Sequence, residues 1–178
     1  MPTLSDKKIA VIVAHKDFKD EEYFVPRGIF DNAGAEVKVA SNELGVAQGS
    51  EGGEVNVDIE INDLNVSEFD AVVFIGGPGA SKNLDNQDSY RIAKDAITQN
   101  KLLCAICISP AILAKAGVFK NKKATVWTSA LNKDAQKVLE GNGAIYQKDS
   151  IVQDGKIITA DGPEVAKDFA EKILDVLK

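Results

Sequence analysis

The feature that most constrains the fold is an alternation of short apolar runs, rich in β-branched residues, with longer segments of helical periodicity. The apolar runs lack polar alternation, which is typical of parallel strands covered on both faces. This alternation predicts an α/β fold, a three-layer sandwich with a mostly parallel, flavodoxin-like sheet. The predicted strands lie within 7–14, 36–41, 70–79, 102–107 and 123–127, followed by a turn in 151–160; the predicted helices are 21–34, 89–100, 129–143 and one from about Pro163.

The chain has the size of one domain. Its 178 residues are 44% hydrophobic, enough for one sizeable core, and no break in composition or internal repeat divides them. We therefore expect a single domain over 1–178. Within it, the glycine-containing stretch 45–63 predicts a hairpin attached to the βαβ layer, and Gly34 is a stop signal for the first helix.

Charge and composition argue against several classes of partner. Lys and Arg number 21 against 27 Asp and Glu, and the longest basic run is in "NKK" at 121–123, so we expect no nucleic-acid partner. The apolar stretches fall far below the ~20 residues that span a bilayer, which predicts no membrane partner and a cytoplasmic protein. One histidine and two separated cysteines offer no metal-ligand cluster, so no metal or other cofactor is expected.

Three segments fall at the carboxyl ends of predicted parallel strands, where open α/β sheets bind ligands. Cys107 follows "LLCAI", the glycines of "GGPG" at 76–79 follow "AVVFI", and "HKDFKDEE" at 15–22 follows the first strand. We expect these segments to meet in one site.

Cys107 has the surroundings of a nucleophile elbow. Ala105 and Ser109 are the small residues that a sharp strand-to-helix turn needs, while Pro110 and Gly117 suit the start and end of a following helix. The start of that helix is expected to favour the thiolate. The alternative is that Cys107 is a small buried hydrophobic residue.

Cys104 is expected to belong to the core. The spacing of Cys104 and Cys107 spells C-x-x-C, but positions three apart on a strand point to opposite faces of a sheet. A redox pair of thiols is therefore not predicted.

Several stretches together resemble the ThiJ/PfpI superfamily nearly end to end. They are "AICISPAILAKAGVFKNKKAT", "FIGGPG", "DFKDEEYFVP" and "VQDGKIITADGP". The resemblance implies that Cys107 is the nucleophile or an oxidisable cysteine. It also implies that Glu22, four residues before Pro26, is a protonated carboxyl group that hydrogen-bonds the cysteine sulfur.

A neutral Glu22 is physically reasonable beside a thiolate, because desolvation and like charge both disfavour its ionised form. Glu22 could then give and take back a proton. The alternative is that Glu22 is one solvated acid among several at a helix start. The resemblance further implies that the backbone N–H groups of Gly77 and Ile108 form an oxyanion hole, although the pair of Gly76 and Gly77 could also make an ordinary turn.

The sequence departs from the protease-like branch of the superfamily. That branch has a histidine where this chain has Ile108, and an acid from a neighbouring subunit where this chain has Ser81. In the deglycase-like branch a histidine occupies the region of Trp127. His15, the only histidine, is either a replacement base over the pocket or a solvated loop residue, and Trp127 either lines the pocket or packs.

These features support three hypotheses about function. The first is a cofactor-independent glyoxalase III or deglycase-like enzyme that acts on a small reactive carbonyl substrate through Cys107 and Glu22. The second is a redox-sensing, stress-protective protein in which Cys107 oxidises to a sulfinate. The third, a PfpI-like peptidase or other hydrolase, is disfavoured by Ile108 and Ser81. The resemblance also implies a homodimer or higher homo-oligomer.

Overall fold

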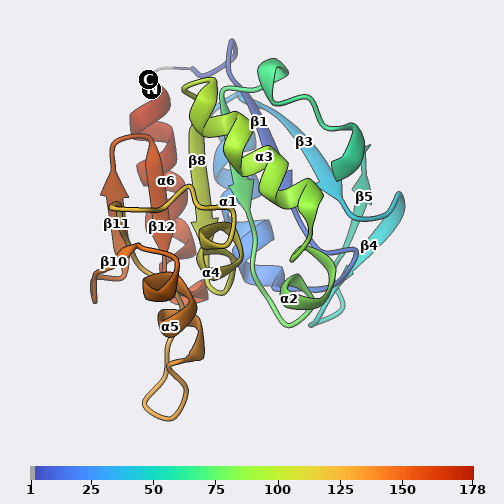
Figure 1. The fold of residues 1–178 in the computed structure, drawn as a ribbon. Coiled ribbons are helices and arrows are strands. Elements are labelled where there is room, and N and C mark those ends of the chain that lie inside the picture. The colour runs from blue at the N-terminus through green and yellow to red at the C-terminus, as the bar shows by residue number, and fades with distance from the viewer. Residues whose placement is uncertain (1–2) are drawn as a thin grey trace.

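A seven-stranded sheet organises the protein, whose computed structural model describes residues 3–178 (Figure 1). The strand order is β11-β12-β8-β7-β1-β3-β6, and only β11 runs antiparallel to its neighbour. The strands are β1 (Lys8–Ile12), β3 (Glu36–Ser41), β6 (Ile59–Glu60), β7 (Ala71–Phe74), β8 (Leu102–Ile106), β11 (Ile151–Asp154) and β12 (Ile157–Ala160).

The order of the parallel strands positions the site. In chain order, β1, β3, β7, β8 and β12 are arranged 2-1-3-4-5, which is the flavodoxin-like order, so the predicted fold class is confirmed. The order reverses between β1 and β7. A ligand crevice is expected outside the carboxyl ends of the strands at that point, where the chain leaves β1, β7 and β8.

Helices cover both faces of the sheet (Figure 1). The helices α1 and α6 pack against each other on one face, and α3 and α4 cover the other. The helices are α1 (Asp20–Asn32), α2 (Ala80–Asn83), α3 (Gln87–Thr98), α4 (Ser109–Ala114), α5 (Asp134–Gly141) and α6 (Ala166–Leu177), with 3-10 turns at Ile61–Asp63, Val66–Glu68 and Pro163–Val165. Gly34 has a φ of +84° just after α1, as expected of a stop residue.

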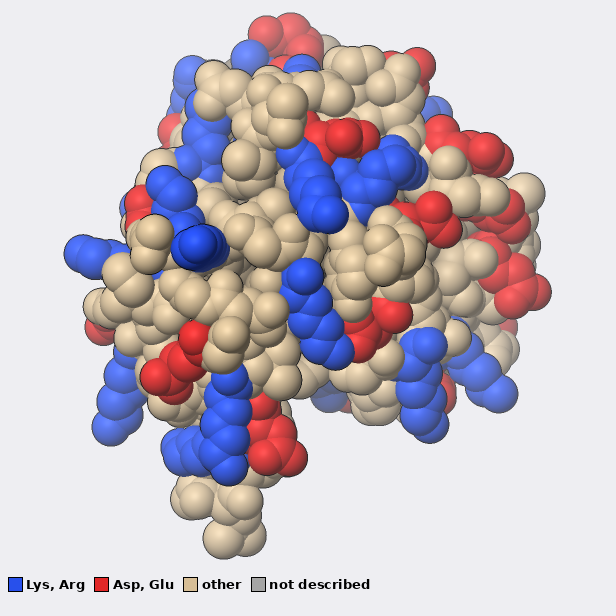
Figure 2. Space-filling model, in the orientation of Figure 1, with Lys and Arg blue, Asp and Glu red and all other residues tan. Residues whose placement is uncertain are grey.

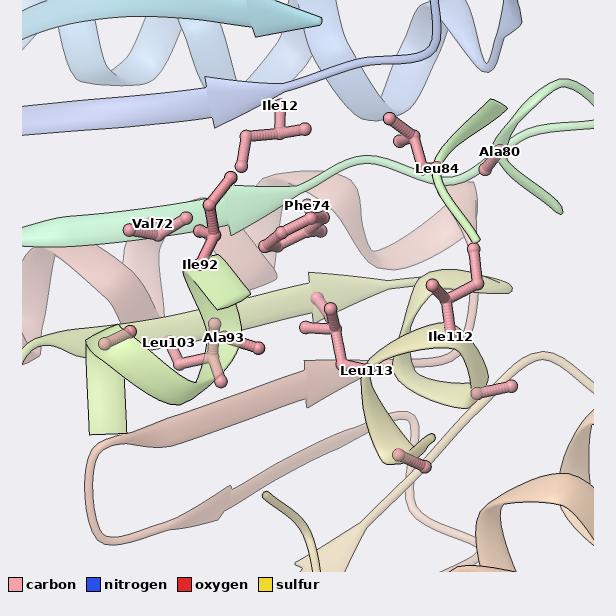
Figure 3. Close-up of a cluster of buried hydrophobic side chains, with 14 of the residues drawn as sticks. Ile12, Val72, Phe74, Ala80, Leu84, Ile92, Ala93, Leu103, Ile112 and Leu113 are labelled. Carbon is pink, nitrogen blue, oxygen red and sulfur yellow. The ribbon is translucent and has the colours of Figure 1, made fainter. Parts of the chain in front are cut away.

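The core is divided between these two faces. Leu103 and Ala105 of β8 pack on the side of α3 and α4, whereas Leu102, Cys104 and Ile106 pack on the side of α1 and α6. Figure 3 shows the first of these clusters, where side chains of the strands meet those of α3 and α4. Burial on both faces explains why the strands read as unbroken apolar runs.

The prediction that Cys104 belongs to the core is confirmed, because its side chain is fully buried. The expectation that Cys104 and Cys107 point to opposite faces of the sheet is wrong. Cys107 packs against the same α1 and α6 side of the core as Cys104. Since β8 ends at Ile106 and Cys107 has a φ of +64°, the alternation of a strand does not extend to Cys107.

The predicted hairpin is present. It consists of β4 (Gly45–Gly49) and β5 (Glu54–Val57), which pair antiparallel, and β2 (Lys16–Phe18) adds a third strand beside β4. The hairpin tip contacts the start of α1, because the Asp20 carboxylate accepts bonds from the N–H groups of Glu51 and Gly53 at 3.0 and 2.7 Å.

Two predicted elements are shorter than expected. The strand predicted at 123–127 is reduced to β9 (Lys123–Ala124), which pairs with β10 (Ile145–Tyr146) outside the central sheet. The reason is that Thr125 N–H donates to the Thr159 hydroxyl at 2.9 Å and Trp127 N–H donates to Cys107 O at 2.8 Å. Neither N–H group therefore takes part in a strand ladder.

The helix predicted at 129–143 begins only at α5. Asn132 N–H donates to the Ser129 hydroxyl at 3.0 Å, and the Asn132 side chain accepts from Asp134 N–H at 2.9 Å. These side-chain bonds favour a turn over a helix at its predicted start.

The visible surface mixes charges of both signs. Figure 2 shows Lys and Arg interspersed with Asp and Glu on the face that Figure 1 presents. Across residues 3–178, no helix is both long and apolar enough to cross a membrane.

Candidate active site

Cys107 lies directly after β8 at a sharp turn into α4, so the predicted nucleophile elbow is present. Its φ of +64° is left-handed, a conformation that costs a non-glycine residue about 1–2 kcal/mol. Cys107 N–H donates to Ala160 O at 2.9 Å, and Cys107 O accepts from Trp127 N–H at 2.8 Å. Backbone bonds on both sides therefore hold a strained residue whose side chain is only partly buried.

The loop after β7 comes close to the elbow because it is built from glycine. A Cβ atom on Gly76 would lie 2.7 Å from Cys107 Cβ and 2.9 Å from Glu22 Oε1. Gly77 has a φ of +113°, and a Cβ there would lie 2.3 Å from Lys19 N. These two glycines therefore do more than form a turn. Because they have no side chains, the loop after β7 can pack closely against both the elbow and the start of α1.

Glu22 points from the first turn of α1 into the protein and is 0% exposed. Its Oε1 accepts a bond from Gly76 N–H at 2.9 Å. Its Oε2 is buried and, among residues 3–178, has no hydrogen-bond partner of ordinary geometry. Burial raises the pKa of Glu22 to about 7, against the bond from Gly76 and the neighbouring Cys107 thiol, which lower it. A carboxyl group of this kind exchanges a proton near neutral pH.

The Cys107 thiol is surrounded by the residues that the sequence singled out. Burial raises its pKa, and the charge of Glu22 raises it further, while the backbone N–H groups of Ile108 and Gly77 lower it. The expectation that the helix start favours the thiolate was therefore wrong for a thiol beside an ionised Glu22. The helix α4 spans only six residues, and its first N–H groups do not outweigh burial and the carboxylate.

We interpret Glu22 and Cys107 as a coupled pair that loses the first of its two protons near neutral pH and then holds one proton between the two groups. When Glu22 carries the proton, the carboxyl group is neutral and no longer repels the thiolate, and its O–H can donate to the sulfur. When Glu22 is ionised, the thiol keeps the proton and can donate to the carboxylate. The two groups titrate together, so the site can present a nucleophile with an acid or a thiol with a base.

His15 is placed away from this pair. Its ring Nδ1 lies 3.1 Å from Glu43 O, and its backbone N–H donates to the Asn42 side chain at 2.9 Å. Both partners follow β3, which lies on the side of β1 opposite to β7. These contacts match a half-exposed loop residue better than a base over the elbow.

Trp127 and Ser81 take different positions. Trp127 is half-buried and hydrogen-bonded through its backbone to Cys107, so the structure places it beside the elbow. Ser81 is exposed on α2.

Several groups that act on this site were not singled out for it from the sequence. Lys19 lowers and Glu164 raises the pKa of Glu22 through their charges, and the Ser109 hydroxyl donates to Ile75 O at 2.9 Å. The sequence offers a signal for Glu164, because it closely follows the stretch 151–160, which ends at Ala160 beside the elbow. For Ser109, the sequence indicates only that a small residue is needed at the elbow, and not that its hydroxyl forms a bond.

Two hollows in the structure lie elsewhere. One of about 230 Å³ is at the amino ends of the strands, lined by Lys101 and Lys156 among others, and one of about 500 Å³ is between α1 and α6, near Leu4 and Leu174. In the described part of the chain, no group of three or more His, Cys, Asp or Glu side chains is arranged to hold a metal ion.

The fold and the site define a class: an α/β protein with a cysteine on a nucleophile elbow and a buried carboxyl group from the first helix. The sequence profile of the DJ-1/PfpI family matches residues 7–176. This chain belongs to the DJ-1/PfpI family, which confirms the resemblance to the ThiJ/PfpI superfamily.

Individual relatives agree with this assignment. A protein of Pyrococcus furiosus named deglycase PfpI is 36% identical over 115 residues, which cover 65% of this chain and 69% of the relative. A glutathione-independent glyoxalase of Caenorhabditis elegans is 26% identical over 98% of this chain and 90% of the relative. The crystal structure of a ThiJ/PfpI domain protein from Brachyspira murdochii has a TM-score of 0.89 at 32% identity, covering 96% of this chain and 95% of that chain.

Proposed function

We propose that this protein converts small 2-oxoaldehydes such as methylglyoxal into 2-hydroxy acids, without a cofactor, using Cys107 as nucleophile and Glu22 as proton carrier. The observation that supports it is the buried Glu22 carboxyl group, which has one unsatisfied oxygen and the partly exposed Cys107 thiol beside it. Relatives named deglycase and glyoxalase point to the same chemistry.

The proposed reaction needs one nucleophile, one mobile proton and water. The Cys107 sulfur bonds to the aldehyde carbon, and the proton of the pair moves to the carbonyl oxygen, giving a hemithioacetal. Ionised Glu22 then removes the hydrogen of that carbon as a proton and returns it to the adjacent keto carbon, while the proton of the hemithioacetal hydroxyl moves to the keto oxygen. This internal transfer oxidises the first carbon to a thioester and reduces the second, and water then cleaves the thioester to release the hydroxy acid and the thiol.

The N–H groups of Gly77 and Ile108 are the proposed stabilisers of the oxyanion that forms when sulfur adds to the carbonyl. Both act on the Cys107 sulfur, so both point toward the reacting position. Gly76 has a separate role in this proposal, because its N–H holds Glu22.

The peptidase alternative receives less support from this geometry. Proteolysis by a cysteine needs a base that takes the thiol proton and later protonates an amine leaving group. Ile108 cannot do so, Ser81 is exposed, and His15 is engaged by the loop after β3.

The decisive experiment measures lactate formed from methylglyoxal in a buffer free of amines and thiols. We expect lactate from the wild type and a loss of at least roughly 100-fold in Cys107→Ala and Glu22→Gln. Cys104→Ala and Glu21→Gln are matched controls, a buried cysteine and an exposed acid next to Glu22, and they should keep the activity. No lactate from folded protein with reduced Cys107 contradicts the proposal for this substrate.

A redox-sensing role is the second candidate, favoured by the two N–H groups and the carboxyl group that surround one thiol. A Cys107 sulfinate would accept bonds from Gly77 N–H and from protonated Glu22. Mass spectrometry after peroxide treatment should then show one stable sulfinate at Cys107, with over-oxidation to the sulfonate in Glu22→Gln. Light scattering in the same samples tests the proposed homodimer.

A further inference from the structure

One peptide group connects the elbow helix to the buried acid. The carbonyl oxygen of Ile75 accepts a bond from the Ser109 hydroxyl at 2.9 Å, and the N–H of the same peptide, on Gly76, donates to Glu22 Oε1 at 2.9 Å. Ser109 and Glu22 are both 0% exposed, so solvent does not compete for either bond. The Ile75–Gly76 peptide is thus held at both ends.

The next peptide is arranged in the same way. The carbonyl oxygen of Gly76 accepts from Lys19 N–H at 3.0 Å, while the N–H of Gly77 acts on the Cys107 sulfur. Each peptide therefore has a donor on its carbonyl and a reactive group on its N–H. A donor on the carbonyl polarises the peptide and strengthens its N–H as a donor. Of the two donors on these carbonyls, Ser109 and Lys19, only Ser109 acts through a side chain that a substitution can remove.

We propose that Ser109 is a positioning residue for the Cys107 and Glu22 pair, because its hydroxyl fixes and polarises the Ile75–Gly76 peptide that binds the Glu22 carboxylate. The inference rests on the pair invoked in the proposed function, although it concerns the proton balance of that pair and not turnover. Loss of the hydroxyl leaves the Ile75 carbonyl unsatisfied and weakens the Gly76 bond, which favours protonated Glu22 over the carboxylate.

Three other groups act on Glu22, and the change of Ser109 replaces none of them. They are Lys19, which lowers the pKa of Glu22, Glu164, which raises it, and Cys107 itself. A shift in Ser109→Ala is therefore assigned to the peptide. The chain offers a matched control in Ser89, a buried serine of α3 whose hydroxyl has no hydrogen-bond partner in the described residues.

The test is the rate of Cys107 alkylation by iodoacetamide as a function of pH, read by peptide mass spectrometry, for wild type, Ser109→Ala, Ser109→Thr and Ser89→Ala. In Ser109→Ala we expect the inflection near neutral pH to rise by roughly half a unit. Above that inflection the rate should rise about threefold, because more of the singly protonated pair is thiolate. Ser109→Thr keeps the hydroxyl and should restore the wild-type inflection, and Ser89→Ala should not move it.

Several outcomes overturn the inference. One is a Ser109→Ala profile that superposes on the wild type. Another is faster alkylation at every pH with no shift of the inflection, as a simple loosening of the structure around Cys107 would give. The third is an equal shift of the inflection in Ser89→Ala. Because alkylation needs no turnover, a protein that forms no lactate can still show the shift, in which case the proposed substrate fails and the role of Ser109 stands. If Ser109→Ala does not fold, the inflection of Ser109→Thr decides: a wild-type value supports the inference and a rise of half a unit overturns it.

Discussion

The two ends of the central sheet carry polar groups in opposite situations. At the amino end, the polar side chains that line the hollow of about 230 Å³ include two with a hydrogen bond, those of Asp70 and Lys156. Asp70 there accepts from Lys8 N–H at 2.8 Å, and the Lys156 ammonium donates to Asn100 O at 2.8 Å. At the carboxyl end, Glu22 is buried with one unsatisfied oxygen, beside a strained cysteine.

The difference shows that the hollow and the reactive side chains lie at opposite ends of the sheet. A hydrogen-bonded polar group in contact with water pays little for its charge. A buried carboxyl group with an unmet hydrogen bond has its charged form disfavoured, so its pKa rises toward neutral pH. The predictions below test whether the contrast holds, beginning with the largest expected effect.

Glu22→Gln should remove a pH dependence of stability that the wild type shows. The pKa of Glu22 is about 7 in the folded protein against 4.5 as the ordinary value, so the folded state binds its proton more tightly. The contribution is fully favourable below about pH 4.5 and is lost as pH rises through about 7, a fall of about 3 kcal/mol in the free energy of unfolding. Urea unfolding at about pH 4.5 and about pH 8 measures it.

The control for this prediction is Glu21→Gln, which changes the exposed neighbour of Glu22 on α1. It should keep the wild-type dependence on pH. A wild type and a Glu22→Gln variant with equal dependence would show that the buried carboxyl group is not the titrating group.

Gly76→Ala and Gly155→Ala compare a glycine at each end. A Cβ on Gly76 meets Cys107, Glu22 and Ile106 O within 2.9 Å, whereas a Cβ on Gly155 meets nothing within 4 Å. We expect Gly76→Ala to lower the free energy of unfolding by about 2 kcal/mol, as overpacking does. Gly155 has a φ of +59°, so its replacement should cost about 1 kcal/mol through strain.

Alkylation of Cys107 separates the two glycine variants further. Gly76→Ala must displace the thiol or Glu22, so it should change both the rate and the pH profile. Gly155→Ala should leave both unchanged. Equal losses of stability together with equal profiles would mean that the close approach at Gly76 is not needed.

The sequence predicted the elements better than their contacts. Apolar runs identified the buried strands, and the order of runs and helices was enough for the sheet, because parallel strands with short connections allow few topologies. The same reasoning placed Cys107, Gly77 and Glu22 at one end. The early end of the strand predicted at 123–127 could not be foreseen, since the N–H groups of Thr125 and Trp127 bond to Thr159 and Cys107, partners far away in the chain.

The electrostatics of the site were the least predictable part. The start of α4 suggested a low pKa for Cys107, but the burial of Cys107 and of Glu22 decides the result, and burial is a property of the packed molecule. Likewise, Ser109 reads as a small residue in the sequence, and its bond to Ile75 appears only when β7 and α4 are packed together.

Cys104→Ala tests the region between the two ends. Cys104 pairs with Val73 and Ile158 within the sheet and is fully buried. Removing its sulfur should lower the free energy of unfolding by roughly 1 kcal/mol, through lost burial and a small cavity. Alkylation of Cys107 should be unchanged. A changed alkylation profile would mean that β8 passes packing changes along its length to the elbow.

Lys156→Ala should give the smallest effect. The bond from its ammonium to Asn100 O is exposed, so its loss should change the free energy of unfolding by less than about 0.5 kcal/mol. Lys156 directly precedes β12, whose other end at Ala160 accepts the bond from Cys107 N–H. The variant therefore tests coupling along one strand. An unchanged pH profile of Cys107 alkylation supports two independent ends, whereas a shifted profile would show that β12 transmits a change at the amino end to the elbow, and the contrast between the ends would then fail.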